Sequence, residues 1–260
     1  MPTAGKGKIH ARNKKIILSI LFLLLIMIIS FLVYNWWQEK RSGFAHYSGF
    51  GIPMPSDYEI FGIDVSHHQA FIQWEAVKKM KDKGIRVGFA FIKATEGYTH
   101  HDRQFKRNWR KAREAGMLRG AYHFFLPSKS GSQQADHFMT TVRLEKGDMP
   151  PVLDVEETHG IPHPIIRKRV REWLEKVERH YGRKPIIYTG VDFYNRVLGS
   201  EFDDYPLWIA HYLKRDNPKI YRKWTFWQFS ETGTVNGISS KVDFNVFHGD
   251  SAALKKLMSP

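Results

Sequence analysis

The stretch Met149-Pro-Pro-Val-Leu-Asp-Val-Glu-Glu157 joins a short apolar run to three acids. The apolar residues and the leading prolines are typical of the start of a buried strand. Because side chains alternate across a strand, Asp154 and Glu156 share one face, with Cβ atoms roughly 6 to 7 Å apart. Like charges at that distance repel, so one carboxyl keeps its proton near neutral pH and the pair supplies an acid and a base. Hydrolysis of a glycosidic bond requires such a pair.

Outward from this strand, short apolar runs alternate with amphipathic stretches. Five strands are expected first, each followed by a helix: the strands at 60–65, 87–93, 120–125, from 152 and 185–189, the helices at 74–84, 105–116, 132–145, from 164 and 191–198. Three further strands, at 207–212, 225–229 and 242–247, are joined by connections without a helical period. This order predicts an α/β fold, an irregular TIM-like barrel of the type (β/α)5(β)3.

Acids from other strands are expected at the same mouth of this barrel. In parallel barrels the active site lies at the C-terminal ends of the strands, and Asp64 ends the first strand as Asp154 does its own. Asp243 lies in the last strand, which is a neighbour of the first in a closed barrel. One such Asp is more often a cap than a catalytic group. Three together indicate a site.

Aromatic residues gather near the same strand ends. Sugar rings stack their C–H faces on aromatic side chains, so an aromatic cleft suits a polysaccharide. The alternative is that these residues belong to the core of the barrel. The residues are Tyr122, Tyr188, Trp208, Tyr212, Trp227 and Phe229.

Composition narrows the class of protein. The 260 residues, 42% of them hydrophobic, suffice for one sizeable core, and the absence of cysteine excludes disulfides and thiolate chemistry. The net charge is +14, of which +8 remains after residue 41, so the globular part suits a polyanionic partner. No nucleic-acid, nucleotide or zinc motif accompanies that charge, and the thirteen histidines lack converging metal-ligand spacing. We expect no cofactor, no metal and no nucleic acid.

The N-terminal region predicts a membrane anchor. Residues 1–15 carry five Lys or Arg and no acid, and the nineteen residues from Ile16 to Tyr34 are apolar except for two serines. Such a helix spans roughly 28 Å, close to the thickness of a bilayer's hydrocarbon core. Trp36 and Trp37 follow as an interfacial belt, and the basic flank is expected to stay cytoplasmic. A cleaved signal peptide, with Gly43-Phe-Ala45 as its site, is the alternative.

These features divide the chain into five segments. We expect a cytoplasmic basic segment at 1–15, a transmembrane signal anchor at 16–37, an exposed linker at 38–57, a catalytic barrel at 58–250 and a tail at 251–260. The barrel is then held on the extracytoplasmic face of a lipid bilayer. The sequence does not identify a protein partner.

Eight short segments of the barrel region together resemble one known family, glycoside hydrolase family 25. The resemblance covers about Phe61 to Phe247, and the segments occur in the family's order. They are Gly62-Ile-Asp-Val-Ser66, Phe91-Ile-Lys-Ala-Thr-Glu-Gly97, Gly120-Ala-Tyr-His-Phe124, Leu153-Asp-Val-Glu156, Tyr188-Thr-Gly190, Leu207-Trp-Ile-Ala-His-Tyr212, Trp227-Gln-Phe-Ser230 and Val242-Asp-Phe-Asn245.

The resemblance implies a lysozyme that cleaves the β-1,4 bond between N-acetylmuramic acid and N-acetylglucosamine in peptidoglycan glycan strands. It implies Glu156 as the general acid and Asp154 as the second carboxylate, with Asp64 and Asp243 in the same pocket. A retaining, an inverting and a substrate-assisted mechanism all remain open. The substrate-binding residues expected from the matched segments are Lys93, Glu96, Tyr122, Tyr188, Trp208, Tyr212, Trp227 and Gln228.

Two alternative functions fit parts of this pattern. A chitinase-like enzyme of glycoside hydrolase family 18 has a further Asp two residues before its D-x-E, where this chain has Val152. A non-catalytic wall-binding module could use the cleft as a sugar clamp, but a binder has no need for the Asp154 and Glu156 pair.

Overall fold

The computed structural model describes residues 5–41, 43–212 and 217–258, and it divides the chain into two compact units, Met1–Ala45 and His46–Pro260. The first unit is dominated by α1 (Gly5–Arg41). Its segment Lys15–Trp37 has a mean hydropathy of 3.3 and its side chains are exposed, so its length and composition suffice to cross a membrane. A membrane anchor and a signal sequence both meet this criterion.

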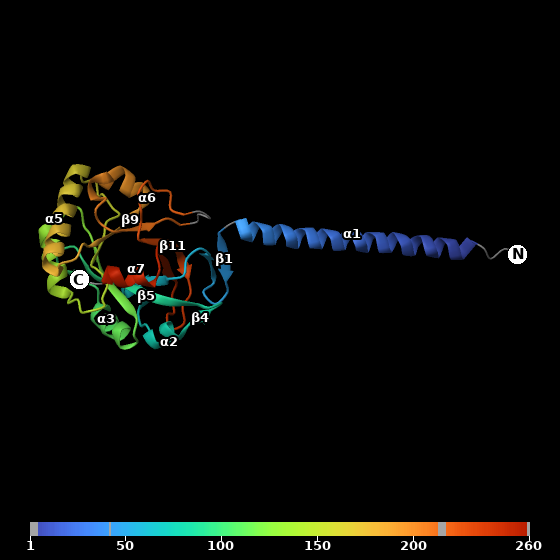
Figure 1. The fold of residues 1–260 in the computed structure, drawn as a ribbon, viewed down its shortest axis with the longest axis horizontal. Helices are drawn as coiled ribbons and strands as arrows, with labels where there is room; N and C mark the ends of the chain where they lie inside the picture. Colours follow the sequence, from blue (N-terminus) through green and yellow to red (C-terminus); the bar gives the residue numbers. More distant parts are fainter. Residues whose placement is uncertain (1–4, 42, 213–216, 259–260) are drawn as a thin grey trace. The chain divides into compact units, whose positions relative to one another are not determined.

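The second unit is a closed barrel (Figure 1). Within the described residues, eight strands form its wall: β3 (Phe61–Val65), β5 (Ile85–Glu96), β7 (Leu118–Phe124), β8 (Val152–Asp154), β9 (Ile186–Gly190), β10 (Leu207–Ala210), β11 (Phe226–Gly233) and β12 (Val242–Phe247). The pairing of β3 with both β5 and β12 closes the barrel. Two short strands, β4 (Lys81–Asp82) and β6 (His100–His101), pair with β5.

Helical segments follow the first five strands, as predicted, and α2, α3 and α5 lie around the outside of the sheet in Figure 1. The segments are η1 (His67–Gln69), α2 (Trp74–Lys79), α3 (Phe105–Glu114), α4 (Gly131–Thr141), α5 (His163–Tyr181), α6 (Val191–Phe193), η2 (Tyr194–Leu198) and η3 (Gly199–Phe202). The longest, α5, begins with Pro164 in its first turn and ends at Gly182, whose φ of 66° is left-handed.

The direction of the last strand differs from the prediction of a parallel barrel. The strands from β3 to β11 run parallel to their neighbours, whereas β12 is antiparallel to both β11 and β3. The start of β12 therefore lies beside the end of β3. Asp243, the second residue of β12, reaches the mouth for this reason and not because it ends a parallel strand.

The lower interior of the barrel is filled by aromatic side chains. Phe89, Phe91 and Phe226 are fully buried and their rings pack 5.1 to 5.7 Å apart. Two glycines make room for them: a Cβ would lie 2.4 Å from the Phe89 ring at Gly62 and 2.6 Å from the Phe91 ring at Gly120. This packed floor confines any ligand to the upper end of the barrel.

Two predicted segments are corrected by the structure. Residues 38–57 were expected to be an exposed linker, but β1 (Phe44–Tyr47) and β2 (Ile52–Pro55) form a two-stranded sheet there. Phe50 is fully buried, with its ring 5.3 Å from that of Phe244. The predicted tail contains α7 (Ser251–Met258), whose Leu254 packs in the same cluster as the aromatic floor. In both segments tertiary contacts bury apolar residues that lack a local pattern.

Candidate active site

A pocket of about 410 Å³ opens where the strands β3, β5, β7, β8, β9, β10 and β11 end and β12 begins. All four predicted carboxyl groups line it: Asp64, Asp154, Glu156 and Asp243. We call this space the inner pocket. Glu231 lines it as well. Burial and mutual repulsion raise the pKa of the four predicted carboxyl groups.

Asp64 is the best-satisfied of these carboxylates. Its Oδ1 accepts hydrogen bonds from Gln228 Nε2 at 2.8 Å and from Asn245 Nδ2 at 2.7 Å. It also shares a hydrogen bond with Asp243, the residue paired with it in the antiparallel ladder. Burial, the Asp64 charge and this hydrogen bond raise the pKa of Asp243 to about 9, so Asp243 holds the proton.

Asp154 and Glu156 form the second acidic pair. Asp154 is buried, and its Oδ1 has no hydrogen-bond partner among the described residues. Burial and the charge of Glu156 raise the pKa of Asp154 well above its usual value, against the opposing effect of Lys93. Partial loss of hydration and the charges of Glu157 and Asp64 raise the pKa of Glu156, which reaches the open space of the pocket. Glu156 is thus an acid that keeps its proton to higher pH than a free glutamate.

Gln228 links several side chains in the wall of the inner pocket by hydrogen bonds. Its Oε1 accepts hydrogen bonds from the hydroxyls of Tyr188, at 2.7 Å, and Tyr212, while its amide donates to Asp64. On the other side Trp208 donates from Nε1 to Asn245 Oδ1 at 2.8 Å, and Asn245 donates to Asp64. Side chains from β9, β10, β11, β12 and the end of β3 are therefore held in one network around the Asp64 carboxylate.

Comparison with known proteins agrees with this geometry. Residues 63–238 match Glycosyl hydrolases family 25. This chain belongs to that family. It is 51% identical over 207 residues to the uncharacterized protein YegX of Escherichia coli K12, covering 80% of this chain and 76% of YegX. It is 36% identical to Lysozyme M1 of Streptomyces globisporus, covering 75% of this chain and 70% of that protein.

The structural comparison gives the same result. The crystal structure of the bacterial lysozyme from Streptomyces coelicolor aligns with a TM-score of 0.70 and 35% sequence identity, covering 77% of this chain and 97% of that one. The family 25 protein described here is therefore a glycoside hydrolase with an irregular α/β barrel, as the sequence predicted.

Six of the eight predicted substrate-binding residues line the inner pocket of this family 25 enzyme: Lys93, Tyr122, Tyr188, Trp208, Tyr212 and Gln228. Trp208 is nearly fully buried and stacks on Phe91, with ring centroids 4.4 Å apart, so it forms the floor. Glu96 does not line the pocket, but its carboxylate lies 2.8 Å from Lys93 Nζ. Its observed contact with the pocket wall is this ion pair.

The expectation that Trp227 lines the cleft is wrong. Because side chains alternate across β11, Phe226 and Gln228 face the barrel interior while Trp227 and Phe229 face outward. Trp227 is buried, and its Nε1 donates to the backbone oxygen of His211 at 2.9 Å. Neither outward-facing ring lines the inner pocket.

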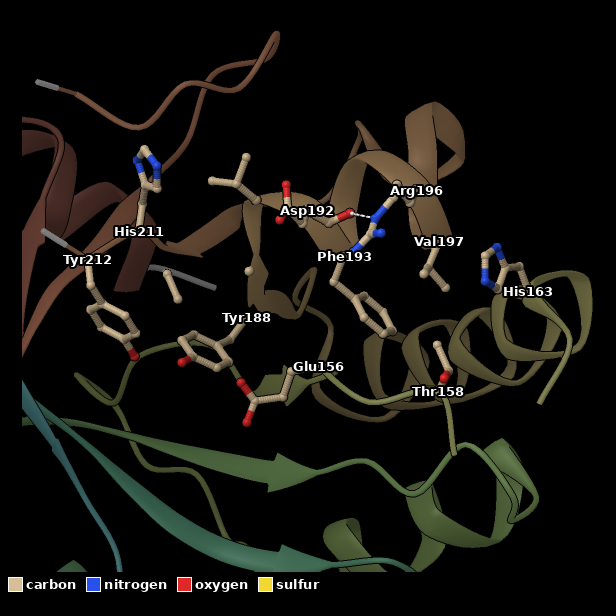
Figure 2. Close-up of a pocket in the computed structure, with 13 residues that line it drawn as sticks. Glu156, Thr158, His163, Tyr188, Asp192, Phe193, Arg196, Val197, His211 and Tyr212 are labelled. Carbon is tan, nitrogen blue, oxygen red and sulfur yellow. Dashed lines mark hydrogen bonds between the residues drawn. The ribbon is translucent and has the colours of Figure 1, made fainter. Parts of the chain in front are cut away.

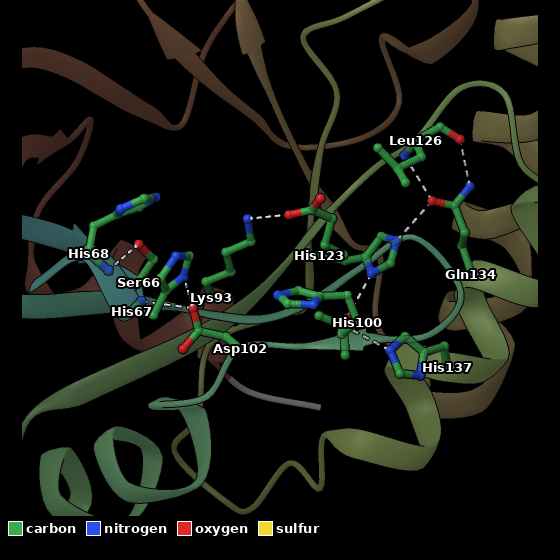
Figure 3. Close-up of polar contacts among 12 residues, drawn as sticks. Ser66, His67, His68, Lys93, His100, Asp102, His123, Leu126, Gln134 and His137 are labelled. Carbon is green, nitrogen blue, oxygen red and sulfur yellow. Dashed lines mark hydrogen bonds and ion pairs between the residues drawn. The ribbon is translucent and has the colours of Figure 1, made fainter. Parts of the chain in front are cut away.

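Polar residues beneath the rim support the family 25 site (Figure 3). Asp102 accepts hydrogen bonds from the backbone N of His67 at 2.8 Å and lies 2.9 Å from its Nδ1, which fixes the loop that carries His68 to the pocket. His123 is fully buried between Thr95 and Gln134, and burial lowers its pKa to about 3. Among the described residues, no group of three or more acids and histidines could hold a metal ion.

A second, larger space adjoins the inner pocket and was not predicted. It has a volume of about 940 Å³ and shares Glu156, Tyr188 and Tyr212 with the inner pocket (Figure 2). We call it the outer groove. Its other walls come from the start of α5 and from α6 and η2, including His163, Phe193 and Arg196. No sequence motif marks these residues as part of the site. They line the groove only because the helices pack on the barrel in this way.

Proposed function

We propose that this enzyme is a muramidase that cleaves the β-1,4 bond between N-acetylmuramic acid and N-acetylglucosamine in peptidoglycan. The observation that supports the proposal most directly is the pairing of Asp154 and Glu156 in one pocket, both with raised pKa. Lysozyme M1 and the N,O-diacetylmuramidase of Arthroderma benhamiae, which is 28% identical, also support it by their names.

In this proposal Glu156 is the general acid. Its raised pKa lets it keep its proton to higher pH than a free glutamate, and its position in open space lets it reach the leaving oxygen. Asp154 is the second carboxylate, and in its ionised form, which the positive charge of Lys93 favours, it stabilises the positive charge that develops on the sugar. The substrate's 2-acetamido group can then serve as nucleophile, with Asp154 orienting it. The configuration of the newly formed anomer tests this route against inversion.

Asp64 and Asp243 have a supporting role. Asp64 is tied to Gln228 and Asn245, and Asp243 holds a proton between the two acids. This arrangement leaves one negative charge on the pair and fixes its position. We propose that the pair binds polar groups of the sugar next to the cleaved bond.

We also propose that α1 anchors the enzyme, with the N-terminus cytoplasmic and the barrel on the extracytoplasmic face. The apolar segment Lys15–Trp37 and the basic residues before it support this orientation. A tethered hydrolase reaches only nearby wall. Such a location favours local remodelling of the wall over wholesale lysis.

The test uses full-length protein in detergent micelles, incubated with peptidoglycan. The products are reduced with borohydride and analysed by mass spectrometry. We expect new muramitol ends from the wild type and from Glu157→Gln, the matched neighbour, and none from Glu156→Gln. Glucosaminitol ends would overturn the assigned bond. No new ends from any folded protein would favour a wall-binding module.

A further inference from the structure

The outer groove has on its wall an arginine that forms no ion pair with another described residue. Arg196, on η2, is exposed and lines the groove (Figure 2). Within the part of the chain that the structure describes, its only hydrogen bond is from Nε to the backbone oxygen of Asp192, at 3.4 Å. The Asp192 carboxylate lines the same wall without forming an ion pair with it.

Neighbouring arginines differ from Arg196 in this respect. Arg167 and Arg171 on α5 both pair with Glu201, at 2.6 and 3.0 Å. Arg222 lies 3.6 Å from Asp203 and donates to the Tyr194 hydroxyl at 2.7 Å. Each of these three guanidinium groups thus has a carboxylate partner within the protein, and Arg167 and Arg171 share theirs. The guanidinium of Arg196 remains available to an anionic ligand.

The inner pocket has the opposite charge. It holds the four acids described above together with Glu231, and the Lys93 ammonium in its wall is already paired with Glu96 at 2.8 Å. A carboxylate on the substrate is therefore repelled more strongly from the inner pocket than from the outer groove, where Arg196 offers a guanidinium without an ion pair beside Asp192 and Glu156.

The wall beside Arg196 is partly apolar. Phe193, from the preceding turn, is half-buried and lines the groove in Figure 2, next to the buried Val197. A ligand with both methyl groups and carboxylates fits such a surface. Uncharged N-acetylated sugars have no group that requires an unpaired guanidinium.

We infer that the outer groove binds the peptide stem carried by a muramyl residue, and that Arg196 pairs with a carboxylate of that stem. The inference rests on the proposed function, because it takes a peptidoglycan strand as the ligand. The stem is attached to the sugar beside the cleaved bond, and the groove begins at Glu156. Its alanine methyl groups and free carboxylates match Phe193 and Arg196 respectively.

The test measures binding of defined glycan strands to full-length protein in detergent micelles, in a Glu156→Gln background. The strands carry peptide stems with free carboxylates or with the same carboxylates converted to primary amides. We compare Arg196→Gln and Arg196→Lys with Arg179→Gln. The last removes the same charge from an exposed position of α5 that lines neither the inner pocket nor the outer groove.

We expect amidation to raise Kd about fivefold for the parent and for Arg179→Gln, the size typical of an exposed ion pair. Amidation should change Kd less than twofold for Arg196→Gln, and by an intermediate factor for Arg196→Lys. An equal loss in Arg196→Gln and the parent, or no loss in the parent, would overturn the inference. Cleavage of the same strands by the wild type is scored separately. Failure to cleave with discrimination intact counts against hydrolysis and not against the stem site.

Discussion

Asp243 lies directly opposite Asp64 in the antiparallel pairing of β12 with β3, and the two carboxyls share a hydrogen bond. Burial and the neighbouring charge favour a proton on Asp243, so this pair carries one negative charge at neutral pH. The first and last strands of the barrel thus meet at a protonated acid. The protonation of Asp243 should therefore make the stability of the folded protein depend on pH.

The pKa of Asp243 is raised in the folded state to about 9, from an ordinary value of 3.8. Its stabilising contribution is therefore fully present below pH 3.8 and is lost as the pH rises toward 9. An asparagine at this position can still donate a hydrogen bond to Asp64, but its side chain does not titrate. We expect Asp243→Asn to flatten the fall of Tm with pH across this window, measured by thermal unfolding. A slope unchanged from wild type would contradict the shared proton.

Glu157 should control the pH range of the reaction. After the loss of hydration, its charge is the next largest cause of the raised pKa of Glu156. We expect Glu157→Gln to lower the pKa of the general acid and to move the alkaline limb of kcat/KM to lower pH. Glu114→Gln removes the same charge from the exposed surface of α3 and should leave the limb in place. A shift in both variants would indicate a general charge effect.

Trp227 should affect stability and not substrate binding. It faces away from the inner pocket and donates a hydrogen bond to His211, so Trp227→Phe should lower the free energy of unfolding by about 2 kcal/mol. KM for glycan strands should stay within about twofold. Tyr212→Phe serves as the comparison, since its hydroxyl lies in the pocket network. A rise of KM in Trp227→Phe without a loss of stability would contradict this prediction and indicate that the ring contacts the substrate.

The segment before the barrel should be part of its folding unit. Phe50 is fully buried against Phe244, and Phe50→Ala should destabilise the barrel by about 3 to 5 kcal/mol in urea unfolding. Ser48→Ala changes an exposed position in the same segment and should have little effect. If both variants unfold like the wild type, residues 46–55 behave as a linker after all.

Deletion of residues 1–37 should separate the hydrolase from the membrane. We expect the full chain in the membrane fraction and the exported deletion variant in the soluble fraction, because the apolar segment is removed. The released enzyme should also lyse cells more indiscriminately, measured as loss of turbidity. Equal lysis by the two proteins would count against a restraining role of the anchor.

Local patterns in the sequence identified most of the barrel and the core of the site. Apolar runs located the eight strands, and helical periods located the helices after the first five. Asp154 and Glu156 were predictable as a pair because they are two residues apart on one short segment. The barrel rule then placed Asp64 at the same mouth, and the inner pocket contains all three.

Only the tertiary structure determined those features that depend on contacts between segments far apart in the sequence. Alternating side chains look the same whichever way a strand runs, so only the pairing with β3 gives the direction of β12 and the position of Asp243. The sheet's closure likewise decided that Gln228 faces the pocket and Trp227 does not. Packing also leaves Arg196 without an ion pair to any other described residue, whereas Arg167 and Arg171 share Glu201. Periodicity is a local property of a chain, whereas strand direction, facing and charge compensation arise only when remote segments pack together.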